Sequence, residues 1–186
     1  MIQDVANSAV GRHLIVLAKA RGVRTVNVVR RDGVAAELRD LGADVVEKDG
    51  PDLAERARTA TGGAPIRLGI DAVSGDACRR IADSVADGGV VVSYGSMSGE
   101  DPALGRAALN MRGVSLTGFN LGRGLAMRTP EKVREVYADL AAKIRDGMLK
   151  APVDSDYPIE DIKPALIRAQ QGGRNGKVLV LPNGPL

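Results

Sequence analysis

The sequence has very few aromatic, histidine and cysteine residues. Its 186 residues include three tyrosines, one phenylalanine and no tryptophan, which argues against a nucleic-acid-binding protein that stacks bases on aromatic side chains. A single cysteine, Cys78, excludes an internal disulfide, and a single histidine, His13, leaves no His/Cys cluster with metal-ligand spacing. We therefore expect neither a metal site nor thiol chemistry.

Long apolar runs and blocks of like charge are also missing. No apolar stretch reaches the roughly 18 residues needed to cross a bilayer, and Asp4 comes too early for the apolar core of a signal peptide. The 26 basic and 23 acidic residues are interspersed, with a formal net charge of +3, which suits a small phosphate-bearing ligand better than a polyanion. We expect a cytoplasmic protein with no nucleic-acid or membrane partner.

Short β-rich segments alternate with helical patterns along most of the chain. This alternation is typical of α/β proteins with a parallel sheet wrapped by helices, and continuous apolar runs such as residues 90–92 suit strands covered on both faces. The sequence predicts a Rossmann-type doubly wound parallel sheet of about six strands. The predicted strands are residues 1–5, 24–29, 43–47, 66–71, 89–94 and 114–119.

Two helices have clear signals. The first is expected to pack on the sheet through a stripe at helical spacing, made of Val10, Leu14, Leu17 and Ala18. The second begins at Thr129 and Pro130, a capping hydroxyl followed by proline at the first helical position, and ends near Gly147. Its apolar stripe consists of Val133, Val136, Tyr137, Leu140 and Ile144.

The pattern changes after this second helix. Residues 150–158 form a turn-rich crossing segment, followed by a short helix that ends at Gln171 and a last strand over residues 177–181. We therefore divide the chain into a domain of residues 1–148 and a tail of residues 149–186. The first residue already belongs to a strand, which fits a complete domain and a domain cut from a longer chain equally well.

The turn between the first strand and the first helix is the candidate phosphate site. A helix N-terminus presents free N–H groups to an anion, and small residues allow close approach of the backbone. The turn matches G-x-G-x-x-G only in part, with glycine at position 11 alone, so an ordinary tight turn remains an alternative. The candidate residues are Asn7, Ser8, Ala9, Val10 and Gly11.

The end of the second strand carries Arg30 and Arg31 followed by Asp32. NAD-preferring proteins place an acidic residue here to hold the ribose 2′-hydroxyl. Two guanidinium groups favour a 2′-phosphate instead, which predicts NADPH as the cofactor. The alternative is a pair of solvated turn charges.

Later strand ends offer two more turns, residues 73–75 and 94–99, where ligands bind in this architecture. No catalytic residue is visible, because no tyrosine is followed four residues later by lysine and neither a G-x-S-x-G nor a P-loop motif occurs. His13 is expected on a solvated helix surface. Cys78 is expected to be a small buried hydrophobic residue.

Three segments together resemble a known family: residues 2–11, residues 24–31 and residues 94–97. They look like the cofactor domain of the medium-chain dehydrogenase/reductase superfamily, and most of all like its zinc-independent 2-enoyl thioester reductase branch, which is related to quinone reductases. The resemblance runs along the whole chain.

The resemblance implies roles for individual residues. Asn7 to Val10 would line the pyrophosphate, Arg30 and Arg31 would hold the 2′-phosphate, and Lys177 would contact the cofactor. The nicotinamide half would be flanked by Tyr94, Gly95, Ser96, Met97, Phe119, Asn120 and Leu121. The chain departs from the family at two positions, with Ala9 in place of a glycine and Asn120 in place of an aromatic residue.

The resemblance also implies a two-domain parent protein. An N-terminal GroES-like catalytic domain carrying the proton-donating tyrosine would precede this chain, and the tail would return to that domain. The implied reaction is NADPH-dependent reduction of a 2-enoyl thioester, with quinone reduction and a non-catalytic dinucleotide-binding module as alternatives. A homodimer is expected through the edge strand from Val114 to Phe119.

Overall fold

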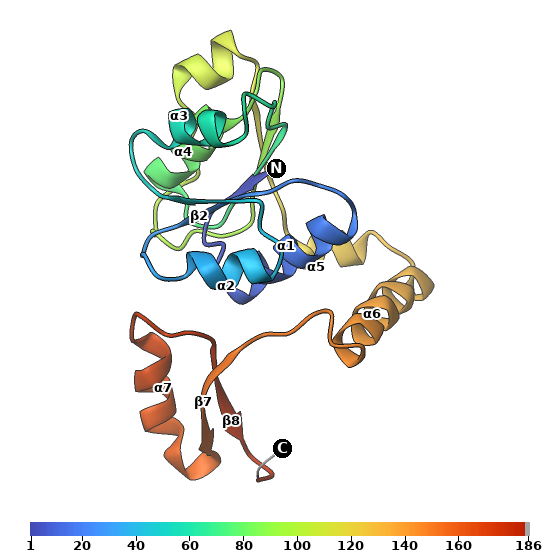
Figure 1. The fold of residues 1–186 in the computed structure, drawn as a ribbon. Coiled ribbons are helices and arrows are strands. Elements are labelled where there is room, and N and C mark those ends of the chain that lie inside the picture. The colour runs from blue at the N-terminus through green and yellow to red at the C-terminus, as the bar shows by residue number, and fades with distance from the viewer. Residues whose placement is uncertain (185–186) are drawn as a thin grey trace.

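A computed structural model describes residues 1–184, and the final two residues of the predicted tail lie outside that range. Its centre is a parallel sheet of six strands in the order β3-β2-β1-β4-β5-β6 (Figure 1). The strands are β1 (Ile2–Gln3), β2 (Val26–Val29), β3 (Val45–Lys48), β4 (Leu68–Asp71), β5 (Val90–Ser93) and β6 (Ser115–Gly118). The predicted doubly wound sheet is confirmed.

The connecting segments are helices. They are α1 (Ala9–Ala20), α2 (Ala35–Asp40), α3 (Leu53–Ala60), α4 (Gly75–Ser84), the π-helix η1 (Ala107–Met111), α5 (Leu121–Ala126) and α6 (Pro130–Arg145). The strand order reverses between β1 and β4, because the chain adds β2 and β3 on one side of β1 and then returns to its other side. Such a reversal opens a crevice at the carboxyl ends of the strands.

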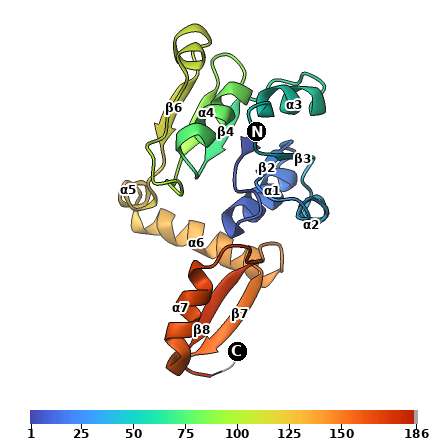
Figure 2. The ribbon, with the colours of Figure 1, turned by 90° about the vertical axis from the view of Figure 1, so that its left-hand side faces the viewer.

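Two apolar clusters cover the two faces of the sheet. One packs side chains of α3 and α4, including Leu53 and Ile81, against Ile2 of β1. The other packs Ile15 of α1 and Leu38 of α2 near the end of β2. Figure 2 shows these two helix pairs on separate sides of the strands.

Helix α1 is rotated relative to the predicted apolar stripe. Its buried residues are Gly11, Arg12, Ile15 and Ala18, whereas Val10 is 49% exposed. Gly11 causes the rotation, because a Cβ there would lie 2.6 Å from the carbonyl oxygen of Ala6 and only glycine permits this contact. Ala18 is buried as predicted, but the part of the stripe predicted from Val10, Leu14 and Leu17 is wrong by about one position.

Helix α6 begins and ends as predicted, with Thr129 accepting a hydrogen bond from the backbone N–H of Lys132 and Gly147 following in a left-handed conformation. Its predicted apolar stripe, however, is not buried. No residue of α6 is buried, and Tyr137 and Ile144 are more than half exposed. Helical periodicity located the helix correctly but did not show what its apolar face contacts.

The tail forms a small unit of its own below the sheet, as Figure 2 shows. It contains β7 (Val153–Pro158), the 3₁₀ turn η2 (Ile159–Asp161), α7 (Ile162–Gln170) and β8 (Lys177–Leu181), with β7 parallel to β8. The expectation of a turn-rich segment over residues 150–158 is thus wrong for β7. The polar residues of β7 form a strand because β8 supplies the ladder and because Asp154 is paired with Arg168 of α7 at 2.6 Å. The domain division after residue 148 stays a prediction.

Within residues 1–184, no helix is both long and apolar enough to cross a membrane.

We expect Gly11→Ala to destabilise the fold strongly, because the added methyl group overlaps backbone atoms of Val5 and Ala6. The free energy of unfolding should fall by about 2 kcal/mol or more in urea denaturation. Gly105→Ala is the matched control, since a Cβ at position 105 meets nothing within 4 Å, and it should change stability by less than about 0.5 kcal/mol. Equal stability of the two variants would contradict the proposed packing of α1.

Candidate functional site

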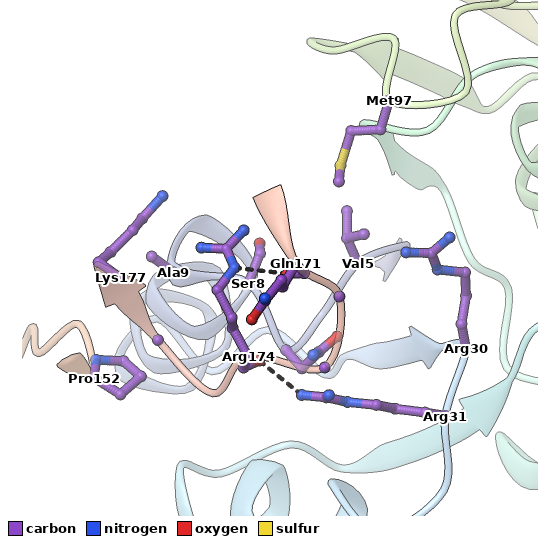
Figure 3. Close-up of a pocket in the computed structure, with 14 residues that line it drawn as sticks. Val5, Ser8, Ala9, Arg30, Arg31, Met97, Pro152, Gln171, Arg174 and Lys177 are labelled. Carbon is purple, nitrogen blue, oxygen red and sulfur yellow. Dashed lines mark hydrogen bonds between the residues drawn. The ribbon is translucent and has the colours of Figure 1, made fainter. Parts of the chain in front are cut away.

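A pocket of about 540 Å³ lies between the carboxyl ends of β1 and β2 and the tail (Figure 3). Three arginines and one lysine line it, and no acidic residue does. The lining residues are Val5, Asn7, Ser8, Ala9, Arg30, Arg31, Met97, Pro152, Gln171, Gly172, Gly173, Arg174, Gly176 and Lys177. All charged side chains that line the pocket are therefore basic, which suits an anionic ligand.

The first turn of α1 forms one wall of the pocket. Ser8 caps this helix, and its Oγ accepts a hydrogen bond of 3.1 Å from the backbone N–H of Gly11. The remaining N–H groups of the first turn are left for a ligand, and they carry the positive end of the helix dipole. Val5, just before this turn, has a φ of 39°, a left-handed conformation that a β-branched residue rarely adopts.

Basic side chains approach from both sides of the pocket. Arg30 is exposed at the end of β2, and Figure 3 shows it on the side of Val5 and Met97. Arg31 instead donates a 3.0 Å hydrogen bond to the backbone oxygen of Arg174 in the tail. The tail thus completes the site, with Arg174 and Lys177 on the opposite wall.

A pair of buried carboxyl groups lies beneath the strand ends. Asp4, at the end of β1, accepts the backbone N–H of Ala72 at 2.9 Å, and Asp71, at the end of β4, accepts the Ser93 hydroxyl at 2.7 Å. Burial, together with the adjacent Asp71, raises the pKa of Asp4 to about 7. Burial and these same two carboxylates also raise the pKa of Tyr94.

Hydrogen bonds from this acid pair fix the later turns. Asp71 accepts the backbone N–H of Ser74 at 2.9 Å, and the hydroxyl of Ser74 donates to the backbone oxygen of Gly95, also at 2.9 Å. Gly95 lies so close to β4 that a Cβ there would be 2.9 Å from the carbonyl oxygen of Ala72. The turns after β4 and β5 are therefore joined at the sheet edge.

The structure brings about half of the predicted site residues together in the pocket. These are Asn7, Ser8, Ala9, Arg30, Arg31, Met97 and Lys177. The others do not line it: Val10, Gly11, Tyr94, Gly95, Ser96, Phe119, Asn120 and Leu121. Gly11 serves helix packing, and Asn120 caps α5 by accepting the N–H of Arg123 at 2.8 Å. Their contacts with a cofactor stay predictions.

Several pocket residues were not predicted from the sequence. Most come from the loop after α7, above all Gln171 and Arg174. The signal for them is the run Gly-Gly-Arg-Asn-Gly-Lys over residues 172–177, in which flexible glycines are interspersed with basic side chains. Its meaning depends on the tail folding back to the sheet, which no local pattern reveals.

The single cysteine lies where the sequence predicts, whereas the single histidine does not. Cys78 is fully buried, as predicted, and burial raises the pKa of its thiol to about 11. His13 is not the solvated residue expected, because it is half-buried and its Nε2 has no hydrogen-bond partner within residues 1–184.

The sequence profile of the zinc-binding dehydrogenases matches residues 9–143. The chain belongs to the zinc-binding dehydrogenase family. This match covers most of the sheet and its helices, including the first turn of α1, and it confirms the resemblance to the medium-chain dehydrogenase/reductase superfamily.

Individual relatives and solved structures are also similar to the chain. The chain is 31% identical over 186 residues to the mitochondrial enoyl-[acyl-carrier-protein] reductase of Dictyostelium discoideum, covering 97% of this chain and 53% of that one. Its fold is similar to a crystal structure described as an NADPH:quinone reductase of Bacillus thuringiensis, with a TM-score of 0.86, 25% identity, and coverage of 95% and 54%. It is also similar in fold to an Etr1p mutant in complex with NADP and crotonyl-CoA, with a TM-score of 0.79, 21% identity, and coverage of 92% and 51%.

The chain spans about half the length of the relatives it matches. The name of the Dictyostelium relative places that protein in mitochondria. A cytoplasmic location for this chain stays a prediction.

The name of the family refers to zinc, but residues 1–184 of this chain do not fit a zinc ion. Within residues 1–184, no three His, Cys, Asp or Glu side chains are grouped so that they could hold a metal. Cys78 is buried with a raised thiol pKa, which opposes the thiolate form that binds zinc.

We expect the stability of the protein to depend on pH through Asp4. Its pKa is raised in the folded state, so the folded protein holds a proton that the unfolded chain releases, and the free energy of unfolding falls as pH rises from about 4 to about 7. Asp4→Asn should remove this slope and raise the melting temperature at pH 8, with little effect at pH 5. Asp87→Asn, at an exposed position, is the control. An unchanged slope in Asp4→Asn would contradict this assignment.

Proposed function

We propose that the chain binds NADPH as the cofactor-binding part of an oxidoreductase that reduces 2-enoyl thioesters. The observation that carries the proposal is the lining of the pocket: four basic side chains and no acidic one, placed against the N-terminal turn of α1. NADPH carries a pyrophosphate and a 2′-phosphate, and both are anions that such a lining would bind. A fold neighbour with bound NADP supports the cofactor class.

Each part of the pocket would have its own task. The backbone of Asn7, Ser8 and Ala9 would approach the pyrophosphate, and Arg30 would bind the 2′-phosphate at the end of β2. The methyl group of Ala9 lies in the lining and narrows the approach to the pyrophosphate. The nicotinamide half would then lie toward Met97 and the turns joined by Ser74.

The substrate class rests on the relatives. The Dictyostelium relative is named an enoyl-[acyl-carrier-protein] reductase, and NADPH supplies a hydride that would add to the β-carbon of such a thioester. We place no proton donor among the lining residues, because none of them is an acid, a histidine or a tyrosine. The reaction proposed here is zinc-independent. A quinone is the alternative acceptor, supported by the name of the Bacillus thuringiensis neighbour.

We expect wild-type protein to bind NADPH more tightly than NADH, and Arg30→Ala to weaken NADPH binding selectively by about tenfold to a hundredfold, since hydrogen bonds to charged groups contribute about 1.5–3 kcal/mol. Titration of NADPH and NADH, followed by nucleotide fluorescence, measures both affinities. Arg39→Ala is the control, because Arg39 lies on α2 and not in the pocket.

Thermal melting with added nucleotide separates the proposal from a non-catalytic module that binds no dinucleotide. A bound nucleotide stabilises the folded state, by about 2.7 kcal/mol when its concentration is 100 times Kd. If neither NADPH nor NADH changes the melting temperature, the proposal fails and a module without a cofactor is favoured. If the wild-type protein binds NADPH and NADH with equal affinity, the assignment of Arg30 to the 2′-phosphate is contradicted, but the binding of a dinucleotide is not.

We also propose that the protein is a homodimer whose two sheets meet at β6. This strand lies at the end of the sheet, and its outer edge carries backbone groups that a second copy would pair. Ser115 and Thr117 are exposed on this strand. In a twofold arrangement each strand meets its own copy in antiparallel order.

We expect the double change Ser115→Lys and Thr117→Lys to shift the protein from dimer to monomer, because like charges would face each other across the twofold axis. Analytical ultracentrifugation measures the mass. Thr59→Lys, at an exposed position on α3, should leave the mass unchanged. A wild-type protein that sediments as a monomer at micromolar concentration would disprove this dimer.

A further inference from the structure

The loop of residues 171–177, between α7 and β8, is tied to the sheet domain although it lies far away in sequence. We propose that this loop is a clamp on the pyrophosphate of the dinucleotide, in which Arg174 supplies the charge and Arg31 positions Arg174. This inference rests on the proposed function, because it assigns further residues to the same nucleotide site.

The position of Arg31 separates it from its neighbour Arg30. Its Nη2 donates a 3.0 Å hydrogen bond to the backbone oxygen of Arg174, 143 residues away. Its Nη1 would lie 3.8 Å from a Cβ placed on Gly173, so the guanidinium lies against the loop. Arg31 is therefore engaged in holding the loop, and Arg30 is the arginine of this pair that is available for a 2′-phosphate.

Arg174 is held with its charged end free. Its Nε donates a 3.0 Å hydrogen bond to the backbone oxygen of Gln171, and its two terminal nitrogens have no acceptor within residues 1–184. Figure 3 shows the side chain extending from the loop toward the start of α1, where Ser8 lies. A phosphate bound at the first turn of α1 would meet this guanidinium from the opposite wall.

The far end of the loop is attached to the same turn of α1. Arg12 is 5% exposed, and its Nη2 donates a 3.0 Å hydrogen bond to Oδ1 of Asn175. Its Nε donates to the backbone oxygen of Asn7 at 3.1 Å, and its Nη1 forms an ion pair of 2.6 Å with Glu37. One buried guanidinium thus joins the loop to the turn that would hold the pyrophosphate.

The loop is also fixed to the tail. The N–H of Asn175 donates to Asp154 at 3.3 Å, and Asp154 is itself paired with Arg168. Gly176 has a φ of 141°, and a Cβ there would lie 2.3 Å from the carbonyl oxygen of Pro152. Because both ends of the loop are held, Arg174 is presented at a fixed place above the pocket.

The clamp has a signature that distinguishes Arg174 from Arg30. A pyrophosphate occurs in both NADPH and NADH, whereas the 2′-phosphate occurs only in NADPH. Loss of the Arg174 charge should therefore weaken both nucleotides by a similar factor and leave their affinity ratio unchanged. Loss of the Arg30 charge should change the ratio.

The test is a titration of the protein with NADPH and with NADH in four variants. Arg174→Ala should raise both Kd values by about tenfold or more, and Arg174→Lys should recover part of the loss because it keeps a charge. Arg31→Ala should also weaken both nucleotides, and Arg31→Lys should recover binding, since a lysine can still donate to the Arg174 carbonyl. Arg39→Ala is again the control.

A second measurement reports the positioning role. Hydrogen exchange of residues 171–176 without nucleotide should accelerate more in Arg31→Ala than in Arg174→Ala, because the first change removes the bond that joins the loop to the sheet domain, whereas the second removes only a bond within the loop. Circular dichroism and melting curves check that each variant folds.

The outcomes are separable. If wild type binds NADPH but Arg174→Ala keeps both Kd values within twofold, the clamp is overturned and the proposed function stands. A selective loss of NADPH in Arg174→Ala would place this arginine at the 2′-phosphate and also overturn the clamp. If wild type binds neither nucleotide, the proposed function itself fails.

Discussion

The buried guanidinium of Arg12 is the interaction on which the arrangement of the site depends. A charge removed from water requires partners on every side, and those of Arg12 come from the turn at Asn7, from Glu37 on α2 and from Asn175 in the tail. Arg12 is inside the protein because Gly11 brings α1 against the backbone of Ala6. One glycine contact thus sets the rotation of α1, and the rotation places Arg12 where it can bind Asn175 of the tail.

The general architecture was predictable because it depends on local patterns. Alternating strands and helices indicated a parallel sheet, and the observed strand order is the doubly wound one. The cap at Thr129, the stop at Gly172 and Gly173, and the strand Lys177–Leu181 each follow from the chemistry of a few neighbouring residues. The predictions were wrong where a contact with a distant part of the chain determines the local structure. Polar β7 is a strand because β8 lies beside it, and the apolar stripe of α6 remains exposed.

The candidate site was predictable to a similar degree and for the same reason. The turn after β1 and the arginines after β2 lie next to recognisable strand ends, so their place at the carboxyl edge of the sheet follows from the fold. The position of the opposite wall, which the tail forms, does not follow from the fold of the sheet. Arg174 and Asn175 reach the sheet domain through contacts that span 143 and 163 residues. Sequence alone therefore treats Arg30 and Arg31 as an equivalent pair, whereas the tail gives them different tasks.

The electrostatics of the site differ above and below the strand ends. Above them, Arg30, Arg174 and Lys177 direct positive charge into a pocket that has no acidic lining residue. Below them, Asp4 and Asp71 are buried side by side, which favours retention of a proton by Asp4. The raised pKa of Asp4 lowers its negative charge near neutral pH, and Asp32, the nearest acid in sequence to the two arginines, is paired with Lys48 at 2.9 Å. The positive potential of the pocket is therefore left for a ligand to neutralise, and a dinucleotide phosphate would stabilise the folded protein by removing the repulsion between these cations.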